Sequence, residues 1–209
     1  MDNMISLQIS RFSVFLKCSS SVTKPSAYAP QYRIMVATLL AMLLSGCAST
    51  SIRGPNYAAQ TPTLDIAEFF DGQVKAWGIV QNRKGNIVQR FTVDIEGTRD
   101  GDSLVLDETF NYSFGEGPAT RIWQLKRLSD GKWTGSANDV FSQAAGSEHG
   151  NAFNWRYQMD LPRGDSGNTV RVWFDDWMWA MDDETIVNRS YIKKFGITFA
   201  EVTIFMRKQ

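Results

Sequence analysis

Five charged residues lie at positions where the local pattern calls for apolar ones. In each case the charged residue lies an even number of positions from apolar neighbours in an alternating segment, so it shares their face of the predicted strand. These residues are Glu108, Arg121, Asp176, Arg189 and Glu201. Such a position directs a charge toward an apolar interior, where it is costly unless a partner compensates it. The sequence therefore predicts that the carboxylates pair with the two arginines inside the fold.

Three kinds of chemistry fit such inward charges. The simplest is a structural ion-pair network that only supports the fold, or strands whose inward and outward faces are assigned the wrong way round. The second is a pocket floor that recognises the polar head of an otherwise apolar ligand. The third is a pair of catalytic carboxylates of the glycosidase type, but no spacing in the chain supports it. Enzyme activity is left open, and the pattern leans toward a non-catalytic protein.

If the interior is a pocket, aromatic side chains supply most of its wall, because aromatics dominate both core packing and ligand contacts. All seven tryptophans lie after residue 46, which is heavy usage for one domain. The predicted lining combines these aromatics with the charged residues: Glu108, Phe110, Tyr112, Arg121, Trp123, Trp155, Tyr157, Phe174, Asp176 and Arg189.

Other familiar chemistry is missing from the sequence. His149 is the single histidine and lies in a glycine-flanked segment, which is typical of an exposed loop. No serine-nucleophile elbow and no glycine-rich phosphate loop is present. The acidic run 182–184 lacks the spacing of a calcium loop. We therefore predict no catalytic residue, metal site or cofactor.

Cys47 carries the clearest chemical signal. It follows Leu44-Ser45-Gly46 and the apolar run 34–43. That run is too short to cross a bilayer as a helix but is typical of a signal-peptide core. The site resembles a bacterial lipobox, which implies cleavage before Cys47, thioether lipidation of its sulfur and acylation of the new amino terminus.

Lipidation predicts where the protein lives. Two or more acyl chains anchor a protein stably in a membrane. The residue after the cysteine is Ala48 and not the aspartate that retains lipoproteins at the inner membrane. We therefore expect an outer-membrane protein facing the periplasm. Residues 1–46 form the signal peptide, which is longer than the usual length of about 15–30 residues. Residues 1–30 are either an extended amino-terminal region or precede the true start, and we favour the second interpretation.

The remaining chain divides into a tether and one domain. Residues 47–63 are rich in Ser, Thr, Ala and Pro and predict a flexible tether. Residues 64–209 are long enough to bury a core without disulfides, and the second cysteine, Cys18, precedes the cleavage site. From Cys47 onward 18 Lys+Arg face 21 Asp+Glu, a net charge of about −3. This balance argues against a nucleic-acid partner.

The domain reads as an all-β chain. A short helix is expected at Leu64–Phe70, with Asp65 near its amino end. Period-two alternation and turn residues then predict strands around 91–95 and 153–161 and at 72–82, 103–114, 119–128, 132–139, 168–181, 185–193 and 197–207. Residues 141–149 are expected to be irregular. Eight to nine strands joined by short turns predict an antiparallel up-and-down meander closed into a barrel.

An ordered set of short motifs resembles a family of bacterial lipoproteins of unknown function, domain-of-unknown-function family 3833. It covers essentially all of residues 64–209 and includes Phe69-Phe70-Asp71-Gly72, Ala76-Trp77-Gly78, Arg90-Phe91, Leu106-Asp107-Glu108 with Phe110 and Tyr112, Gly135 through Asp139-Val140, Gly146 with Gly150-Asn151-Ala152, Asp175-Asp176-Trp177-Met178, Asn188-Arg189-Ser190, Lys194-Phe195-Gly196 and Glu201-Val202-Thr203. The family has no assigned activity, so no catalytic residue is implied.

The opening of the domain also looks lipocalin-like. Gly72 and Trp77 resemble the glycine and tryptophan near the first lipocalin strand, although their spacing here is longer. The resemblance implies that Trp77 closes one barrel end, with Arg189 or Arg207 packing over it. Fold likeness alone does not establish ligand binding.

These observations support three functional hypotheses. The first is a lipid-anchored barrel that binds a small apolar or acyl-chain molecule. The second is a non-catalytic module for protein interaction in envelope assembly or stress response, with an exposed aromatic patch around Trp173, Trp177 and Trp179. The third is an enzyme acting on modified lipids. The sequence identifies no protein partner.

Overall fold

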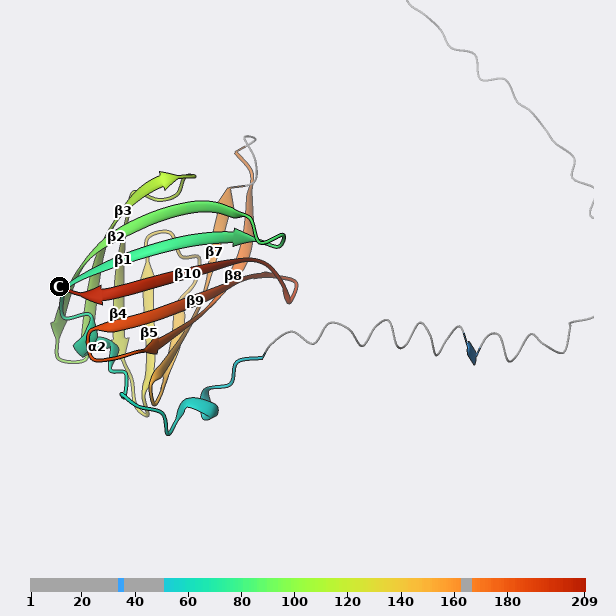
Figure 1. Cartoon of the computed structure of the whole chain (residues 1–209). Helices are drawn as coiled ribbons and strands as arrows, with labels where there is room; N and C mark the ends of the chain where they lie inside the picture. Colours follow the sequence, from blue (N-terminus) through green and yellow to red (C-terminus); the bar gives the residue numbers. More distant parts are fainter. Residues whose placement is uncertain (1–33, 36–50, 163–166) are drawn as a thin grey trace, which may run out of the picture. The chain divides into compact units, whose positions relative to one another are not determined.

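A computed structural model describes residues 34–35, 51–162 and 167–209. Ten antiparallel strands form a closed barrel in which each strand pairs with its neighbours in sequence and β1 pairs with β10 (Figure 1). The strands are β1 (Gly72–Asn82), β2 (Ile87–Asp100), β3 (Ser103–Phe114), β4 (Thr120–Arg127), β5 (Lys132–Ala137), β6 (Ala144–His149), β7 (Ala152–Pro162), β8 (Thr169–Ala180), β9 (Thr185–Lys194) and β10 (Ile197–Lys208).

The closed meander confirms the predicted fold class, with one or two strands more than expected. The additional strand is β6, within the segment predicted to be irregular. Its inward positions carry Ala144 and Gly146, so the sequence shows no large alternating apolar residues there. The small residues are required by packing, because a β-carbon on Gly146 would lie 2.5 Å from the rings of both Phe153 and Trp155.

The up-and-down order gives the barrel two different ends. The turns between β2 and β3, β4 and β5, and β8 and β9 lie at one end together with the start of β1 and the finish of β10. We call this the plugged end, because the short helix α2 (Ile66–Phe69) lies there (Figure 1). The hairpins β1–β2, β3–β4 and β9–β10 lie at the opposite, open end.

Helix α2 closes the plugged end with apolar side chains. Asp65 caps the helix by accepting hydrogen bonds from the backbone N–H groups of Ala67 (2.9 Å) and Glu68 (3.2 Å). Phe69 and Phe70 are buried in the core, with their rings in edge contact at 5.0 Å. The predicted short helix is therefore present, although it spans Ile66–Phe69 and not Leu64–Phe70, and it fills the plugged end of the barrel.

The core is concentrated toward the plugged end. The inward side chains nearest that end are almost completely buried, among them Val74, Leu104, Trp133, Phe153 and Ile186. Toward the open end, by contrast, inward side chains are less completely buried, and they include Glu108, Phe110, Tyr112, Leu161 and Val170. We refer to the barrel as a cup, with a densely packed base at the plugged end and an upper half toward the open end.

A short 3-10 turn, η1 (Gly54–Tyr57), packs against the outside of the barrel. The ring of Tyr57 lies 6.0 Å from the rings of both Trp177 and Trp179. Gly54 is buried, and a β-carbon there would lie 2.4 Å from the His149 ring. The part of the predicted tether that includes Gly54–Tyr57 is thus bound to the barrel surface, so the prediction of a free tether up to residue 63 is wrong for this turn.

The predicted lipidation site lies outside the described residues. Cys47 and almost all of the predicted signal peptide, residues 1–46, belong to the part that the structure does not describe. Within the described part, no helix has the length and apolar character needed to cross a membrane.

Candidate functional site

An ion-paired arginine lies inside the upper half of the barrel. Arg121 on β4 is the register partner of Glu108 on β3, and its Nη1 lies 3.8 Å from Glu108 Oε2. The same guanidinium makes a bidentate contact with Asp139, which follows β5, through Nε to Oδ1 (2.9 Å) and Nη2 to Oδ2 (2.7 Å). Two-point pairing of this kind is the strongest that arginine offers. Arg121 is therefore committed to Asp139 first and to Glu108 second.

A second buried carboxyl comes from β8. Asp176 is 8% exposed, and its Oδ2 accepts a hydrogen bond of 3.2 Å from the hydroxyl of Tyr157 on β7. Ser190 on β9 is the register partner of Asp176 on the other side. Strands β3, β4, β7, β8 and β9 thus contribute to one polar cluster, which comprises Glu108, Arg121, Asp139, Tyr157, Asp176 and Ser190.

Burial dominates the electrostatics of this cluster. It raises the pKa of Glu108 to about 7, against the opposing attraction of Arg121, while the charges of Asp139 and Asp176 raise it further. Burial likewise raises the pKa of Asp176 to about 7, although Ser190, Tyr157 and Arg121 oppose the rise. The two carboxyls therefore exchange protons near neutral pH, in the range where a bound charge can shift them.

The same carboxyls have oxygens without hydrogen-bond partners. Oδ1 of Asp176 and Oε2 of Glu108 are both buried, and neither accepts a hydrogen bond from the described residues. The hydroxyl of Ser190 is close enough to affect the pKa of Asp176 but forms no aligned hydrogen bond. Buried polar atoms are usually satisfied, so unsatisfied ones call for an explanation. Here they mark unused acceptor capacity within the cup.

Aromatic rings surround the polar cluster. Trp123 lies 5.2 Å from Tyr157, and Tyr157 is stacked on Phe174 at 5.0 Å. The guanidinium carbon of Arg121 lies 5.5 Å from the centre of the Phe110 ring and 6.0 Å from that of Trp123. Ring faces carry partial negative charge, so this wall favours positive groups as well as apolar ones.

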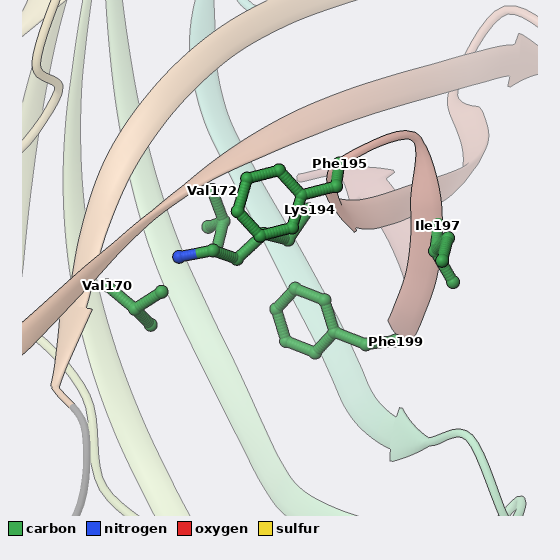
Figure 2. Close-up of a pocket in the computed structure, with 6 residues that line it drawn as sticks. All are labelled: Val170, Val172, Lys194, Phe195, Ile197 and Phe199. Atoms are coloured by element: carbon green, nitrogen blue, oxygen red, sulfur yellow. The ribbon is translucent and has the colours of Figure 1, made fainter.

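An apolar pocket of about 310 Å³ lies at the open end. The pairing of β8 with β9 begins at Trp173, which lies opposite Lys193. Val170 and Val172, which precede Trp173 on β8, have no partner in this register. The β9–β10 hairpin faces these two valines, as Figure 2 shows, and the pocket occupies the resulting gap. Its lining is Val170, Val172, Lys194, Phe195, Ile197 and Phe199.

The structure brings together nine of the ten residues predicted to line a pocket. These nine occupy inward-facing positions of the barrel: Glu108, Phe110, Tyr112, Arg121, Trp123, Trp155, Tyr157, Phe174 and Asp176. The tenth, Arg189, is exposed on the outer face, so its prediction as an inward charge is wrong. The inward face of β9 carries Ile186, Asn188, Ser190 and Ile192, whereas Val187, Arg189 and Tyr191 lie on the outer face.

Glu201 also lies on the opposite face from the predicted one, but for a different reason. The register between β9 and β10 shifts between Thr198 and Ala200, as in a β-bulge. Beyond this shift the inward positions are Ala200, Val202 and Met206, which are buried, whereas Glu201 lies on the opposite face. The prediction that Glu201 points inward is therefore wrong, because simple alternation does not register an inserted residue.

Gly72 and Trp77 do not act together to close the barrel. Gly72 begins β1 with a φ of 101°, a conformation that favours glycine. Trp77 is on the outer face, 43% exposed, with its ring 5.9 Å from that of Phe205. The predicted closure by Trp77 is thus wrong, and Phe69 and Phe70 of α2 occupy the barrel end instead.

The predicted exposed patch of tryptophans is only partly exposed. Trp173 is 49% exposed, whereas Trp177 is buried between Tyr57 and His149. Trp179 is stacked beside Trp177, with ring centres 6.3 Å apart. The chain therefore covers much of this surface itself.

Sequence reasoning missed two members of the polar cluster. Asp139 follows the end of β5, where alternation no longer indicates direction, and only the fold brings it to Arg121. Ser190 was placed on the wrong face together with the rest of β9. Among the described residues, no three His, Cys, Asp or Glu side chains are arranged to hold a metal ion.

The chain is similar to a solved structure and to a protein family. One solved structure with a similar fold is an S-type phycobiliprotein lyase, CPES, from Guillardia theta, with a TM-score of 0.48 and 11% sequence identity. The match covers 70% of this chain and 94% of the lyase chain. The search of curated proteins found no significant match. A family model described as a protein of unknown function, DUF3833, matches residues 41–208, and the chain therefore belongs to the DUF3833 family.

Proposed function

We propose that this protein is a lipid-anchored lipoprotein of the outer membrane, facing the periplasm, whose barrel binds a small amphiphilic molecule. The anchor is the lipidated Cys47, and the binding site is the upper half of the cup. The polar end of the ligand contacts Glu108 and Asp176, and its apolar part extends toward the open end. No catalytic step is required of the site.

The buried oxygen Oδ1 of Asp176 is the observation that carries this proposal. Asp176 is only 8% exposed, and Oδ1 accepts no aligned hydrogen bond from the described residues, although the Ser190 hydroxyl lies near the carboxyl and opposes the rise of its pKa. A buried acceptor without a partner costs roughly 1–3 kcal/mol. A ligand that supplies a donor would remove this cost, which gives the interior a physical reason to bind one.

The inner face of β8 connects this oxygen with the apolar pocket. Val172, Phe174 and Asp176 occupy successive inward positions on the strand. At about 3.3 Å per residue, roughly 13 Å separate Val172 from Asp176 along the strand. A ligand whose polar end contacts the carboxyl would need an extended apolar part of about 13 Å, passing Phe174, to reach the apolar pocket at Val172. Its volume of about 310 Å³ is at the lower end of the range for small-molecule sites.

Native mass spectrometry of the full chain, extracted from bacterial membranes in a mild detergent, tests this function. An amphiphile that co-purifies in near-stoichiometric amount, and that organic extraction identifies, is the expected result. The Asp176→Asn variant should lose it, whereas Arg189→Ala should retain it, because Arg189 lies outside the barrel. An empty protein that also fails to bind added amphiphiles would overturn the proposal.

The anchor is tested separately. A Cys47→Ser variant should no longer incorporate labelled fatty acid and should leave the membrane fraction. The wild-type chain should sediment with outer-membrane markers on a density gradient. Incorporation of label into the serine variant would contradict lipidation at Cys47.

An exposed aromatic pair supports a second candidate, the interaction module. Trp77 and Phe205 are each 43% exposed on the outer faces of β1 and β10. Such a surface suits a protein partner, and a Trp77→Ala change would weaken that complex without altering ligand content. The third hypothesis, an enzyme acting on modified lipids, requires loss of a measurable activity in Glu108→Gln without loss of folding.

A further inference from the structure

We propose that the head group recognised by the polar cluster is a cationic amine, so that the ligand is an amine-bearing amphiphile and not a fatty acid. This inference rests on the proposed function, because it assumes that the cup binds a ligand. It concerns only the chemistry of the polar end. The reasons are the balance of charges, the occupation of Arg121 and the position of the free acceptors.

The cluster holds more carboxyl groups than cations. Glu108, Asp139 and Asp176 lie around a single guanidinium, that of Arg121. A ligand carboxylate would add a fourth acidic group to the three carboxyl groups that already surround this guanidinium. An ammonium group would instead compensate the excess, because a buried charge is tolerated when an opposite charge and hydrogen bonds accompany it.

Arg121 is not available to a ligand carboxylate. Its Nε and Nη2 atoms already donate to both oxygens of Asp139, at 2.9 Å and 2.7 Å, and Nη1 faces Glu108 at 3.8 Å. A fatty-acid head would have to displace one of these partners and leave it as an unpaired buried charge. Among the described residues that line the pocket at the open end, the one base is Lys194, whose ammonium lies 5.3 Å from the Phe195 ring.

The unused groups of the cluster are mostly acceptors. Oδ1 of Asp176 accepts no aligned hydrogen bond from the described residues, and Oε2 of Glu108 has only the ion pair with Nη1 of Arg121 at 3.8 Å, which is too long for a hydrogen bond. A primary ammonium carries three N–H donors and no acceptor, which matches this set. The rings of Trp123 and Tyr157 beside the carboxyls add further attraction for a cation. A carboxylate head, which only accepts, would leave both oxygens unsatisfied.

Amine binding should depend on pH in a characteristic direction. An ammonium favours the ionised forms of Glu108 and Asp176, so its binding releases protons and tightens as the pH rises through about 7. The ammonium itself stays charged in this range, with an ordinary pKa of about 10. The other titratable or charged groups acting on these two carboxyls are Arg121, Asp139, Tyr157, Tyr112, Asp107 and Asp175.

Isothermal titration calorimetry of the full chain with octylamine, octanoate and 1-octanol tests the inference. At pH 8 octylamine should bind at least about tenfold more tightly than octanoate. The affinity for octylamine should fall severalfold when the pH is lowered to 6. Octanoate should show no such fall. The Asp176→Asn and Glu108→Gln variants should each weaken octylamine binding about tenfold.

Asp94→Asn is the matched control, because Asp94 pairs with Lys75 on the outer face and should leave all three affinities unchanged. Melting curves show whether each variant is folded, and either inner variant suffices if the other does not fold. Octanoate or octanol binding as tightly as octylamine would overturn the amine inference and leave the binding function standing. Absence of binding by all three, together with absence of a co-purified ligand, would overturn both.

Discussion

The hydroxyl of Tyr157 donates a 3.2 Å hydrogen bond to Oδ2 of Asp176 inside the barrel, and Oδ1 of the same carboxyl has no partner among the described residues. One half of this buried acid is therefore held in place, and the other half is free to accept. The arrangement explains why Asp176 is both a positioned group and an incompletely satisfied one. It also makes the barrel sensitive to pH.

Stability should decrease as the pH rises from about 4.5 to 7. Glu108 and Asp176 have folded-state pKa values of about 7, above their ordinary values, because burial disfavours their charged forms. In this range the folded state binds more protons than the unfolded state, so the free energy of unfolding falls with pH and then levels off. Urea unfolding at pH 4.5 and pH 8 measures the difference.

A Glu108→Gln/Asp176→Asn double variant should lose this dependence. At pH 8 it should exceed the wild type in stability by roughly 1–4 kcal/mol, because neither amide can ionise. Asp65 and Asp175 do not affect stability in this pH range, because their pKa values are lowered in the folded state. The stability that these two ionised carboxylates contribute is lost only at more acidic pH. A wild type whose stability increases steadily from pH 4.5 to 8 would contradict the prediction.

Removal of Asp139 should lower the pKa of Glu108. In an Asp139→Asn variant, Arg121 loses its bidentate partner and the repulsion between Asp139 and Glu108 disappears. The variant should unfold about 3 kcal/mol more easily, because a buried cation loses its main partner. NMR titration of the Glu108 side-chain carboxyl measures the pKa. Asp160→Asn, which breaks the exposed pair with Arg171, is the control and should leave stability nearly unchanged.

Loss of Tyr57 should expose the tryptophans beneath η1. A Tyr57→Ala variant removes the ring that lies 6.0 Å from both Trp177 and Trp179. We expect a loss of roughly 1–3 kcal/mol, red-shifted tryptophan emission and faster proteolysis around residue 57. Asn56→Ala, an exposed neighbour on the same turn, should leave emission and proteolysis unchanged. Equal proteolysis of the two variants would show that Tyr57 does not hold the turn.

Gly97 should be essential for the plug. A β-carbon at this position on β2 would lie 1.5 Å from the carbonyl oxygen of Phe70, which is backbone and cannot rotate away. Gly97→Ala should therefore displace α2 from the barrel end and destabilise the fold by about 3 kcal/mol or more. Thr98→Ala, at an exposed position one residue later, should change stability by less than about 0.5 kcal/mol. Thermal melting of the two variants provides the comparison.

The sequence alone determined the local structure. Alternation and turn residues were enough to predict an antiparallel meander that closes, and a capped helix before it, because these features depend on neighbours along the chain. The same pattern placed Glu108, Arg121 and Asp176 inside, since each lies within a run of large apolar residues on one face. For β6 the signal was missing, because its inward positions are the small residues Ala144 and Gly146.

Only the tertiary structure decided which side of β9 and β10 faces inward. Alternation shows which residues share a face, but Ile186 and Ile192 on one face of β9 are matched by Val187 and Tyr191 on the other, so it could not place Arg189. For Glu201 the register shift near Thr198 reversed the expected side. Closure of the barrel also brought Asp139 from a connection to Arg121. These outcomes depend on strand register and on contacts between distant segments, which no local pattern contains.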